Sequence, residues 1–101
     1  MTPIEEIAAE RERQKTVEGW TAEHDDEHDD DDLAIAAACY ALPDRIRRIV
    51  IFDRTLLERI WPWSKDWWKP KRDRRRQLVK AGALIVAEIE RLDRAAQQEA
   101  A

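Results

Sequence analysis

The strongest structural signal in the chain lies between Asp73 and the C-terminus. Apolar or small side chains recur there at intervals of three and four residues, which places them on one face of an α-helix. This apolar stripe consists of Leu78, Gly82, Ile85, Ile89, Leu92 and Ala96, and Ala81 and Leu84 widen it. The pattern therefore predicts a long amphipathic C-terminal helix. Such a helix is long enough to pair with its copy, so we expect a homodimer.

A second helix is predicted at the N-terminus. Thr2 and Glu5 have the spacing of a capping box, and Pro3 takes the first helical position, where its missing N–H costs no hydrogen bond. Gly19 offers a left-handed stop to this helix, and Trp20 then follows as an anchor. The apolar residues that fall roughly on one side, opposite the Glu and Arg residues, are Ile4, Ile7, Ala8 and Val17.

The middle of the chain gives a mixed pattern. Residues 33–42 are apolar almost all round, which favours a central helix that ends before Pro43. Residues 21–32 contain no apolar residue beyond Ala22, so we expect a loop or solvated turn whose last aspartates cap that helix. Residues 43–60 fit either an extended run or a helical turn. Residues 61–70 hold four tryptophans and two prolines, which predicts an ordered aromatic loop.

Together these segments predict one all-α domain over residues 1–101. We expect a small bundle of three to four helices, with the tryptophan- and proline-rich loop before the long last helix. Cys39 is the only cysteine, so it excludes an intrachain disulfide and fits a reducing cytoplasm. No segment approaches the ~20 apolar residues of a membrane span, and residues 1–20 lack a signal-peptide core. A cytoplasmic protein that does not enter membranes is expected.

Charge is sorted along the chain, with acidic residues crowded into positions 23–32 and basic residues into 65–80. The run HDDEHDDDD at 24–32 can bind a divalent cation, because closely spaced carboxylates repel one another. Alternatively, it is hydrated and favours the dipole of the following helix. His24, Glu27 and His28 also match a zinc-binding H-x-x-E-H spacing, although the segment does not look helical and no third ligand follows.

The aromatic and basic block is the other candidate surface. Trp67 and Trp68 can stack on a base while neighbouring cations attract phosphate. These cations are Lys69, Lys71, Arg72, Arg74, Arg75 and Arg76. Alternatively, the tryptophans close one end of the helical core and the basic residues pair with the acidic run. Arg11 and Arg13 are expected to be surface ion-pair partners of nearby glutamates.

Several blocks of the sequence resemble a family of small phage and prophage proteins. The blocks are residues 9–14 (AERERQ), 18–26 (EGWTAEHDD), 33–41 (LAIAAACYA), 61–63 (WPW), 67–70 (WWKP) and 75–94 (RRQLVKAGALIVAEIERLDR). These phage proteins are in turn distantly similar to the MazG-like all-α nucleoside triphosphate pyrophosphohydrolases. Such enzymes hold Mg²⁺ through carboxylates on facing helices, because the hard cation prefers oxygen ligands and neutralises phosphate charge.

The resemblance implies a set of site residues. Mg²⁺ would be held by Glu6 and Glu10, or alternatively Glu5 and Glu12, from the first helix. Asp25 and Asp26, and also Asp29, would add carboxylates from the loop. A nucleotide would be contacted by Trp67, Trp68, Lys69, Arg75 and Lys80. The late acidic pair of the enzymes is replaced here by Gln77 and Lys80, an amide and a cation. This departure leaves open whether an Mg²⁺-dependent pyrophosphohydrolase activity is retained.

The expected function is therefore recognition of a nucleotide or nucleotide-derived ligand by a small phage-type protein, acting in the host cytoplasm if it is phage-encoded. A degenerate or metal-dependent nucleotide pyrophosphohydrolase is one form of this function. The alternative is a non-catalytic inhibitor of a host defence protein. It would act by sequestering a ligand or by imitating the negative charge of nucleic acid.

Overall fold

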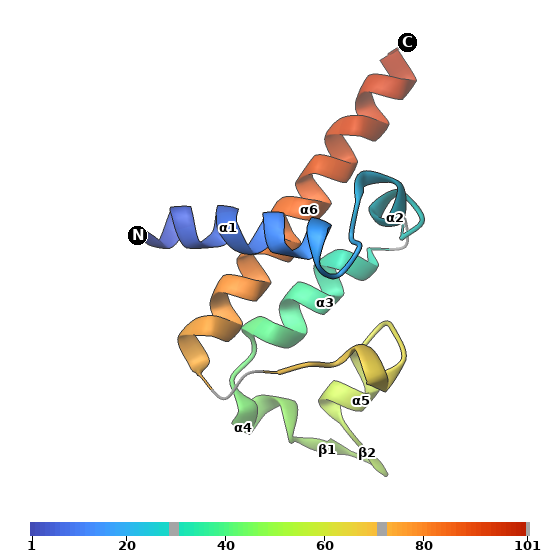
Figure 1. The fold of residues 1–101 in the computed structure, drawn as a ribbon. Helices are drawn as coiled ribbons and strands as arrows, with labels where there is room; N and C mark the ends of the chain where they lie inside the picture. The colour runs from blue at the N-terminus through green and yellow to red at the C-terminus, as the bar shows by residue number, and fades with distance from the viewer. Residues whose placement is uncertain (29–30, 71–72, 101) are drawn as a thin grey trace.

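The chain forms an all-α structure with one very small hairpin (Figure 1), as seen in a computed structural model that describes residues 1–28, 31–70 and 73–100. The longer helices are α1 (Pro3–Thr16), α3 (Asp32–Ala41) and α6 (Arg74–Ala100). The shorter helices are α2 (Ala22–Asp26), α4 (Asp44–Arg47) and α5 (Leu56–Ile60). The predicted fold class and long C-terminal helix are confirmed. Within the described ranges, no helix is both long and apolar enough to cross a membrane.

Helix α6 organises the molecule, because α3 packs along it and α1 crosses it (Figure 1). The buried residues between α3 and α6 are mostly small, which lets the two helices approach closely. The core comprises Trp20, Leu33, Ala36, Ala37, Tyr40, Ala81, Leu84 and Ala87. Cys39 is also buried, and this burial raises the pKa of its thiol to about 11 despite the opposing charge of Arg47. The thiol therefore serves as a small apolar group, as expected.

The N-terminal helix begins as predicted. The Thr2 hydroxyl accepts a hydrogen bond from the Glu5 N–H (3.2 Å), and the Glu5 carboxylate accepts one from the Thr2 N–H (3.0 Å). After the helix, Gly19 has φ +74°, a left-handed conformation that glycine adopts without steric cost. Trp20 then enters the core with 7% exposure. The predicted stop and anchor are both confirmed.

Residues 21–28 differ from the predicted loop. Thr21 caps a short helix, α2, through its hydroxyl, which accepts a hydrogen bond from the His24 N–H (3.4 Å). The polar composition concealed this helix, because its stability comes from the cap and from tertiary ion pairs. Asp31 lies at the N-cap position of α3 but forms no side-chain capping bond. Asp29 lies outside the described residues.

Residues 43–60 use both conformations that the sequence left open. Strands β1 (Val50–Ile51) and β2 (Arg54–Thr55) pair antiparallel, with Val50 opposite Thr55. Phe52, in the turn between them, has φ +62° and is 94% exposed. Helix α5 follows directly, started by a second capping box between Thr55 and Glu58.

The tryptophan-rich segment is ordered, as predicted, and contains one turn of 3₁₀ helix, η1 (Lys65–Trp67). Trp61, Trp63 and Trp68 pack against the core formed by α3 and α6. Their rings also contact one another, with centroids 5.4 Å apart for Trp61 and Trp63 and 5.0 Å for Trp61 and Trp68. Aromatic packing thus replaces regular backbone hydrogen bonding in this segment.

The faces that α1 and α6 bury overlap only in part with the apolar faces found in the sequence, since Ala81 and Leu84 are buried but most of the stripe is exposed. In α6, Leu78, Ile85, Ile89 and Leu92 are 46–52% exposed. The buried residues of α6 are Gln77, Val79, Lys80, Ala81, Ala83, Leu84, Ala87 and Glu88. In α1, Ile4 and Val17 are exposed, whereas the buried residues are Glu10, Arg11 and Gln14. Close approach through alanines and pairing of buried charges favour these faces, which periodicity does not detect.

Candidate functional site

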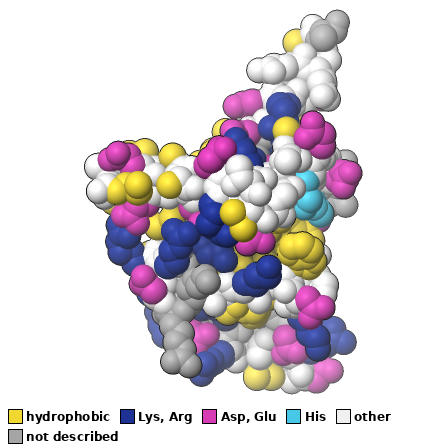
Figure 2. All heavy atoms as spheres, viewed as in Figure 1, with side chains coloured by type: hydrophobic (Ala, Val, Ile, Leu, Met, Phe, Trp, Pro, Cys, Tyr) yellow, Lys and Arg dark blue, Asp and Glu magenta, His cyan; other side chains and the backbone are white. Residues whose placement is uncertain are grey.

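A cavity of about 290 Å³ lies between α1, α6 and the residues that lead into α6. Its lining residues are Arg13, Glu18, Lys69, Arg76 and Lys80, and we call it the cationic cavity. Figure 2 shows lysine and arginine side chains gathered on this face of the molecule, just below α1. Four of its five lining side chains are cations, so the cavity favours an anion.

Two carboxylates hold these cations in place. Glu10 is 1% exposed and binds Arg13 (2.8 Å) and Arg76. Burial raises the pKa of Glu10, but the Arg13 hydrogen bond and the charges of Arg13, Arg76 and Lys80 outweigh it, so the pKa lies below its ordinary value. Glu18 pairs with Arg13 (3.1 Å) and Lys69 (3.5 Å). The cations are therefore fixed in a cluster that keeps an excess of positive charge.

Lys69 and Lys80 are linked to the core through Tyr40. The buried Lys80 ammonium donates to the Lys69 carbonyl oxygen (3.0 Å) and lies over the Tyr40 ring, 4.8 Å from its centroid. The Lys69 N–H donates to the Tyr40 hydroxyl (3.2 Å). Both backbone polar groups of Lys69 are thus bonded, while its side chain reaches the cationic cavity.

A second cavity of about 360 Å³ is lined mainly by aromatic rings. Its lining residues are Trp20, His24, His28, Trp63, Ser64 and Trp67, and we call it the aromatic cavity. His24 stacks on Trp20 at a centroid distance of 6.0 Å, and His28 lies 4.7 Å from His24 and 5.3 Å from Trp63. The indole N–H of Trp63 is buried and has no hydrogen-bond partner in the described part of the chain. The cavity thus combines ring faces with few polar groups, as small-molecule sites do.

One cation–π pair connects the two cavities. The Lys69 ammonium lies 5.4 Å from the centroid of the Trp67 ring. Lys69 lines the cationic cavity, and Trp67, which is 45% exposed, lines the aromatic cavity. A ligand with a flat aromatic group and a negative group can therefore contact both side chains at once.

Three of the five predicted nucleotide-binding residues lie around these cavities, namely Trp67, Lys69 and Lys80. Trp68 instead stacks on Tyr40 (centroid distance 4.6 Å) and lines a separate cavity of about 380 Å³. Arg75 is exposed and binds Glu6 through both terminal nitrogens. Trp68 and Arg75 are thus separate from the joined cavities. Lys71 and Arg72 lie outside the described residues.

The four carboxylates predicted to bind Mg²⁺ do not converge. Each pairs with at least one arginine: Glu6 with Arg75, Glu10 with Arg13 and Arg76, Asp25 with Arg11, and Asp26 with Arg94. Among the described residues, no group of three His, Cys, Asp or Glu side chains is arranged to hold a metal ion. The magnesium site stays a prediction, and its predicted carboxylates serve here as ion-pair partners.

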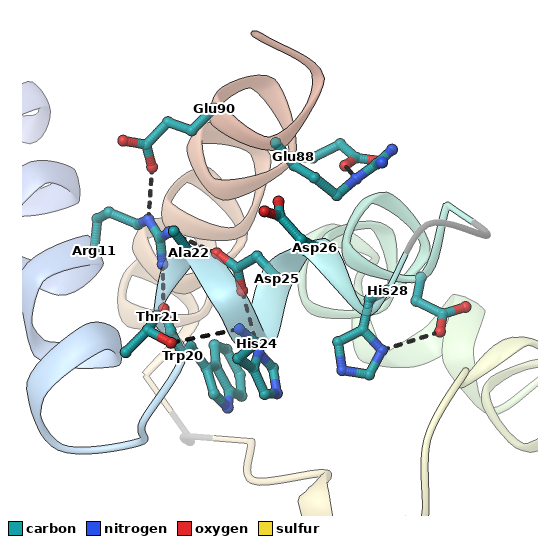
Figure 3. Close-up of polar contacts among 12 residues, drawn as sticks. Arg11, Trp20, Thr21, Ala22, His24, Asp25, Asp26, His28, Glu88 and Glu90 are labelled. Atoms are coloured by element: carbon teal, nitrogen blue, oxygen red, sulfur yellow. Dashed lines mark hydrogen bonds and ion pairs between the residues drawn. The ribbon is translucent and has the colours of Figure 1, made fainter. Parts of the chain in front are cut away.

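Arg11 is buried, which corrects the predicted surface ion pair (Figure 3). Its guanidinium donates to Asp25 (2.6 Å), to the Trp20 carbonyl (3.2 Å) and to Glu90 (2.8 Å). Asp25 is fully buried and lies 3.2 Å from a ring nitrogen of His24. This junction of α1, α2 and α6 therefore positions the histidine side of the aromatic cavity.

The histidines of the predicted zinc motif lie one helical turn apart. His24 is within α2, and His28 follows it, with a ring nitrogen 3.4 Å from Asp32. Both rings line the aromatic cavity. Their placement gives them a role in that cavity that does not require a metal.

The two residues that replace the family's late acidic pair have structural contacts. The buried Gln77 side-chain oxygen accepts from Arg47 (3.2 Å) and Arg74 (3.3 Å), which connects α4 to α6. Lys80 contacts Lys69 and Tyr40 as described above. An anion at either position would change these contacts.

Sequence reasoning missed several residues of the two cavities. They are Arg13, Glu18, Trp20 and Trp63, and the histidines were considered only as zinc ligands, whereas Arg76 was among the cations expected to attract phosphate. Arg13 lies among several Glu and Arg residues of α1, and the sequence does not distinguish it from Arg11. The repeated tryptophans signalled an aromatic site, but they did not reveal which rings face a cavity.

Comparisons with known proteins gave no match, whether with protein-family models, curated proteins or solved structures. The resemblance to phage proteins and to MazG-like hydrolases therefore stays a prediction, and function must be argued from the two cavities.

Proposed function

We propose that the protein binds a nucleotide or nucleotide-derived ligand, with phosphate in the cationic cavity and the base in the aromatic cavity. The observation that carries this proposal is the contact between Lys69 and Trp67, which joins the two cavities. A base stacked beside Trp67 would place its phosphate within reach of the Lys69 ammonium.

The cationic cavity has the chemistry that phosphate requires. Arg13 and Arg76 supply guanidinium groups, and Lys69 and Lys80 supply ammonium groups. Hydrogen bonds between such cations and phosphate oxygens are stronger than neutral ones. Glu10 and Glu18 hold the cations together before the ligand arrives, so less side-chain entropy is lost on binding.

The aromatic cavity supports stacking of a base. Stacking on an aromatic side chain contributes about 1–3 kcal/mol per base, and Trp67 and Trp63 offer indole rings at this cavity. His24 and His28 add ring nitrogens that can bond the edge of a base. The buried Trp63 N–H is a further donor, available if the ring adjusts.

The same contacts favour capture over hydrolysis. The carboxylates expected to hold Mg²⁺ are paired with arginines, and Gln77 and Lys80 take part in helix packing. A protein of this kind would retain its ligand without turnover. This behaviour suits the expected phage inhibitor that sequesters a nucleotide signal. It suits charge mimicry less well, because Asp25 and Asp26 already have arginine partners.

Thermal unfolding with a panel of ligands tests the proposal. Nucleoside mono-, di- and triphosphates and cyclic dinucleotides, each with and without Mg²⁺, are compared with nucleosides and pyrophosphate. We expect a nucleotide to raise Tm more than its nucleoside or pyrophosphate does, because it contacts both cavities. Pyrophosphate release is assayed in parallel. Release that requires Mg²⁺ would show that the protein hydrolyses the nucleotide and does not only capture it.

Substitutions of Lys69 and Trp67, the pair that joins the two cavities, test whether the ligand binds there. Lys69→Ala should weaken binding about tenfold or more, the loss expected for one charge-assisted hydrogen bond. Trp67→Ala should remove about 1–3 kcal/mol of stacking. Arg45→Ala and Phe52→Ala are matched controls, because they remove an exposed cation and an exposed ring that line neither cavity. Equal losses in the controls, or no response to any nucleotide, would refute the proposal.

A further inference from the structure

Three side chains with ring nitrogens lie next to one another in the aromatic cavity. The ring of His28 is adjacent to both others, with its centroid 4.7 Å from that of His24 and 5.3 Å from that of Trp63. All three side chains line the cavity. A flat ligand whose edge faces them can therefore contact Trp63, His28 and His24 in that order.

Two carboxylates select the tautomers of the histidines (Figure 3). The Nδ1 atom of His24 lies 3.2 Å from a carboxylate oxygen of Asp25, and the Nδ1 atom of His28 lies 3.4 Å from one of Asp32. A carboxylate accepts hydrogen bonds, so each Nδ1 atom carries the proton of the neutral imidazole. The Nε2 atom of each ring is then a lone-pair acceptor. Neither Nε2 atom has a hydrogen-bond partner in the described part of the chain.

Trp63 has the opposite hydrogen-bonding character. Its indole N–H can only donate, and it is buried without a partner among the described residues. A buried donor without a partner costs free energy, and an acceptor on a ligand would remove that cost after a small rotation of the ring. The three side chains thus offer one donor followed by two acceptors.

Guanine has the complementary pattern on its Watson–Crick edge. That edge carries the O6 acceptor, the N1–H donor and the N2 amino donor, in this order. Adenine offers one donor and one acceptor on the same edge, and cytosine and uracil each offer one donor and two acceptors. Of the common bases, only guanine combines one acceptor with two donors.

We propose that the aromatic cavity selects guanine. The Trp63 N–H donates to O6, N1–H donates to His28 and the N2 amino group donates to His24, while Trp67 stacks on the base. This inference rests on the proposed function, because the cavity reads the edge of a base only if a nucleotide binds there.

Calorimetric titration with altered bases tests the selection at about pH 8, where imidazole is neutral. Guanine, hypoxanthine, adenine and 7-deazaguanine nucleotides are compared as 5′-monophosphates and as 5′-triphosphates. Hypoxanthine lacks the N2 amino group, so its Kd should be about tenfold higher than that of guanine. Adenine turns a donor toward the Trp63 N–H, so its Kd should be about 100-fold higher. 7-Deazaguanine keeps the Watson–Crick edge and should bind as guanine does.

The outcomes separate this inference from the proposed function. Equal affinity for guanine and adenine would overturn the selection while nucleotide binding stands. Loss of affinity with 7-deazaguanine would also overturn it, because the protein would then read the N7 side of the base. No binding of any nucleotide would refute the proposed function as well.

Substitution of single rings tests the individual contacts. His24→Phe keeps a ring but removes the acceptor for the N2 amino group. It should weaken GMP binding about tenfold and leave IMP binding unchanged, because IMP lacks that group. Trp63→Phe should weaken both nucleotides equally, because both have O6. Trp67→Ala is the control, since loss of stacking affects both bases alike. Equal weakening of GMP and IMP by His24→Phe would contradict the assigned contact.

Discussion

The two faces of α6 invert the usual relation between burial and hydrophobicity. The face against α1 and α3 is rich in alanine and includes Gln77, Lys80 and Glu88, whereas the solvent face carries Ile85, Ile89 and Leu92. Alanines allow close helix packing, and the buried polar groups are hydrogen-bonded or paired. The comparison teaches that apolar periodicity identifies a helix without telling which face its own bundle covers.

Loss of the buried ion pair between Arg11 and Asp25 should have the largest effect on stability. Asp25→Ala leaves the buried Arg11 guanidinium without its shortest partner, so the free energy of unfolding should fall by about 3–5 kcal/mol. Urea denaturation measures this change. The adjacent Asp26→Ala is the control, because Asp26 is 41% exposed and its pair with Arg94 contributes about 1 kcal/mol or less. Equal losses would mean that burial of the pair does not matter.

Two adjacent residues of α6, one on each face, should differ clearly in their contribution to stability. Leu84 is fully buried and Ile85 is 49% exposed. Leu84→Ala should destabilise the chain by about 2–5 kcal/mol, through lost contacts and the cavity left behind. Ile85→Ala should cost the monomer less than about 1 kcal/mol. Both are measured by chemical denaturation at submicromolar concentration, where dimerisation contributes least; a larger loss at Ile85 would contradict the assigned faces.

Acid should lower the stability of the fold by a smaller amount, through protonation of Glu10 between α1 and α6. Glu10 has a pKa below its ordinary value of 4.5, so its ionised form stabilises the fold above the unfolded-state pKa. That contribution is lost as pH falls through the lower, folded-state pKa. The free energy of unfolding should therefore change little between pH 7 and about 5 and then decrease below that range. Glu10→Gln should make the acid decrease shallower, and an unchanged slope would contradict this assignment.

Substitution of Gly82, which lies at the edge of the exposed face of α6 where α1 packs, should change stability the least. Gly82→Ala gains about 0.8–1.0 kcal/mol of helix propensity but places a Cβ 2.8 Å from Ile7. Because the nearest atom is the end of a flexible side chain, we expect a net change within about 1 kcal/mol. In an Ile7→Val background the same substitution should be more stabilising. A double-mutant cycle measured by thermal unfolding tests this coupling.

Much of the fold followed from local sequence rules. The capping box at Thr2, the left-handed Gly19, the central helix and the long last helix were all predictable, because each depends on neighbouring residues. The buried face of α1 and the short helix α2 were not. Their stability comes from partners distant in sequence, such as Arg11 with Asp25 and Glu90.

The candidate site was only partly predictable for the same reason. Trp67, Lys69 and Lys80 stand in a segment whose aromatic and basic composition marks it as unusual. Arg13 and Trp20 reach the cavities from the other end of the chain, and composition gives no sign of that approach. Trp67 and Trp68 are adjacent in sequence but line different cavities, so only the backbone path separates their roles.

The attachment of Lys69 to Tyr40 has a kinetic consequence. Its N–H and carbonyl are already bonded, to the Tyr40 hydroxyl and to Lys80, before any ligand arrives. The backbone of Lys69 is therefore already held in place when a ligand arrives. Ligand entry should therefore follow simple second-order kinetics, with an observed rate that rises linearly with ligand concentration rather than reaching a plateau set by a conformational step.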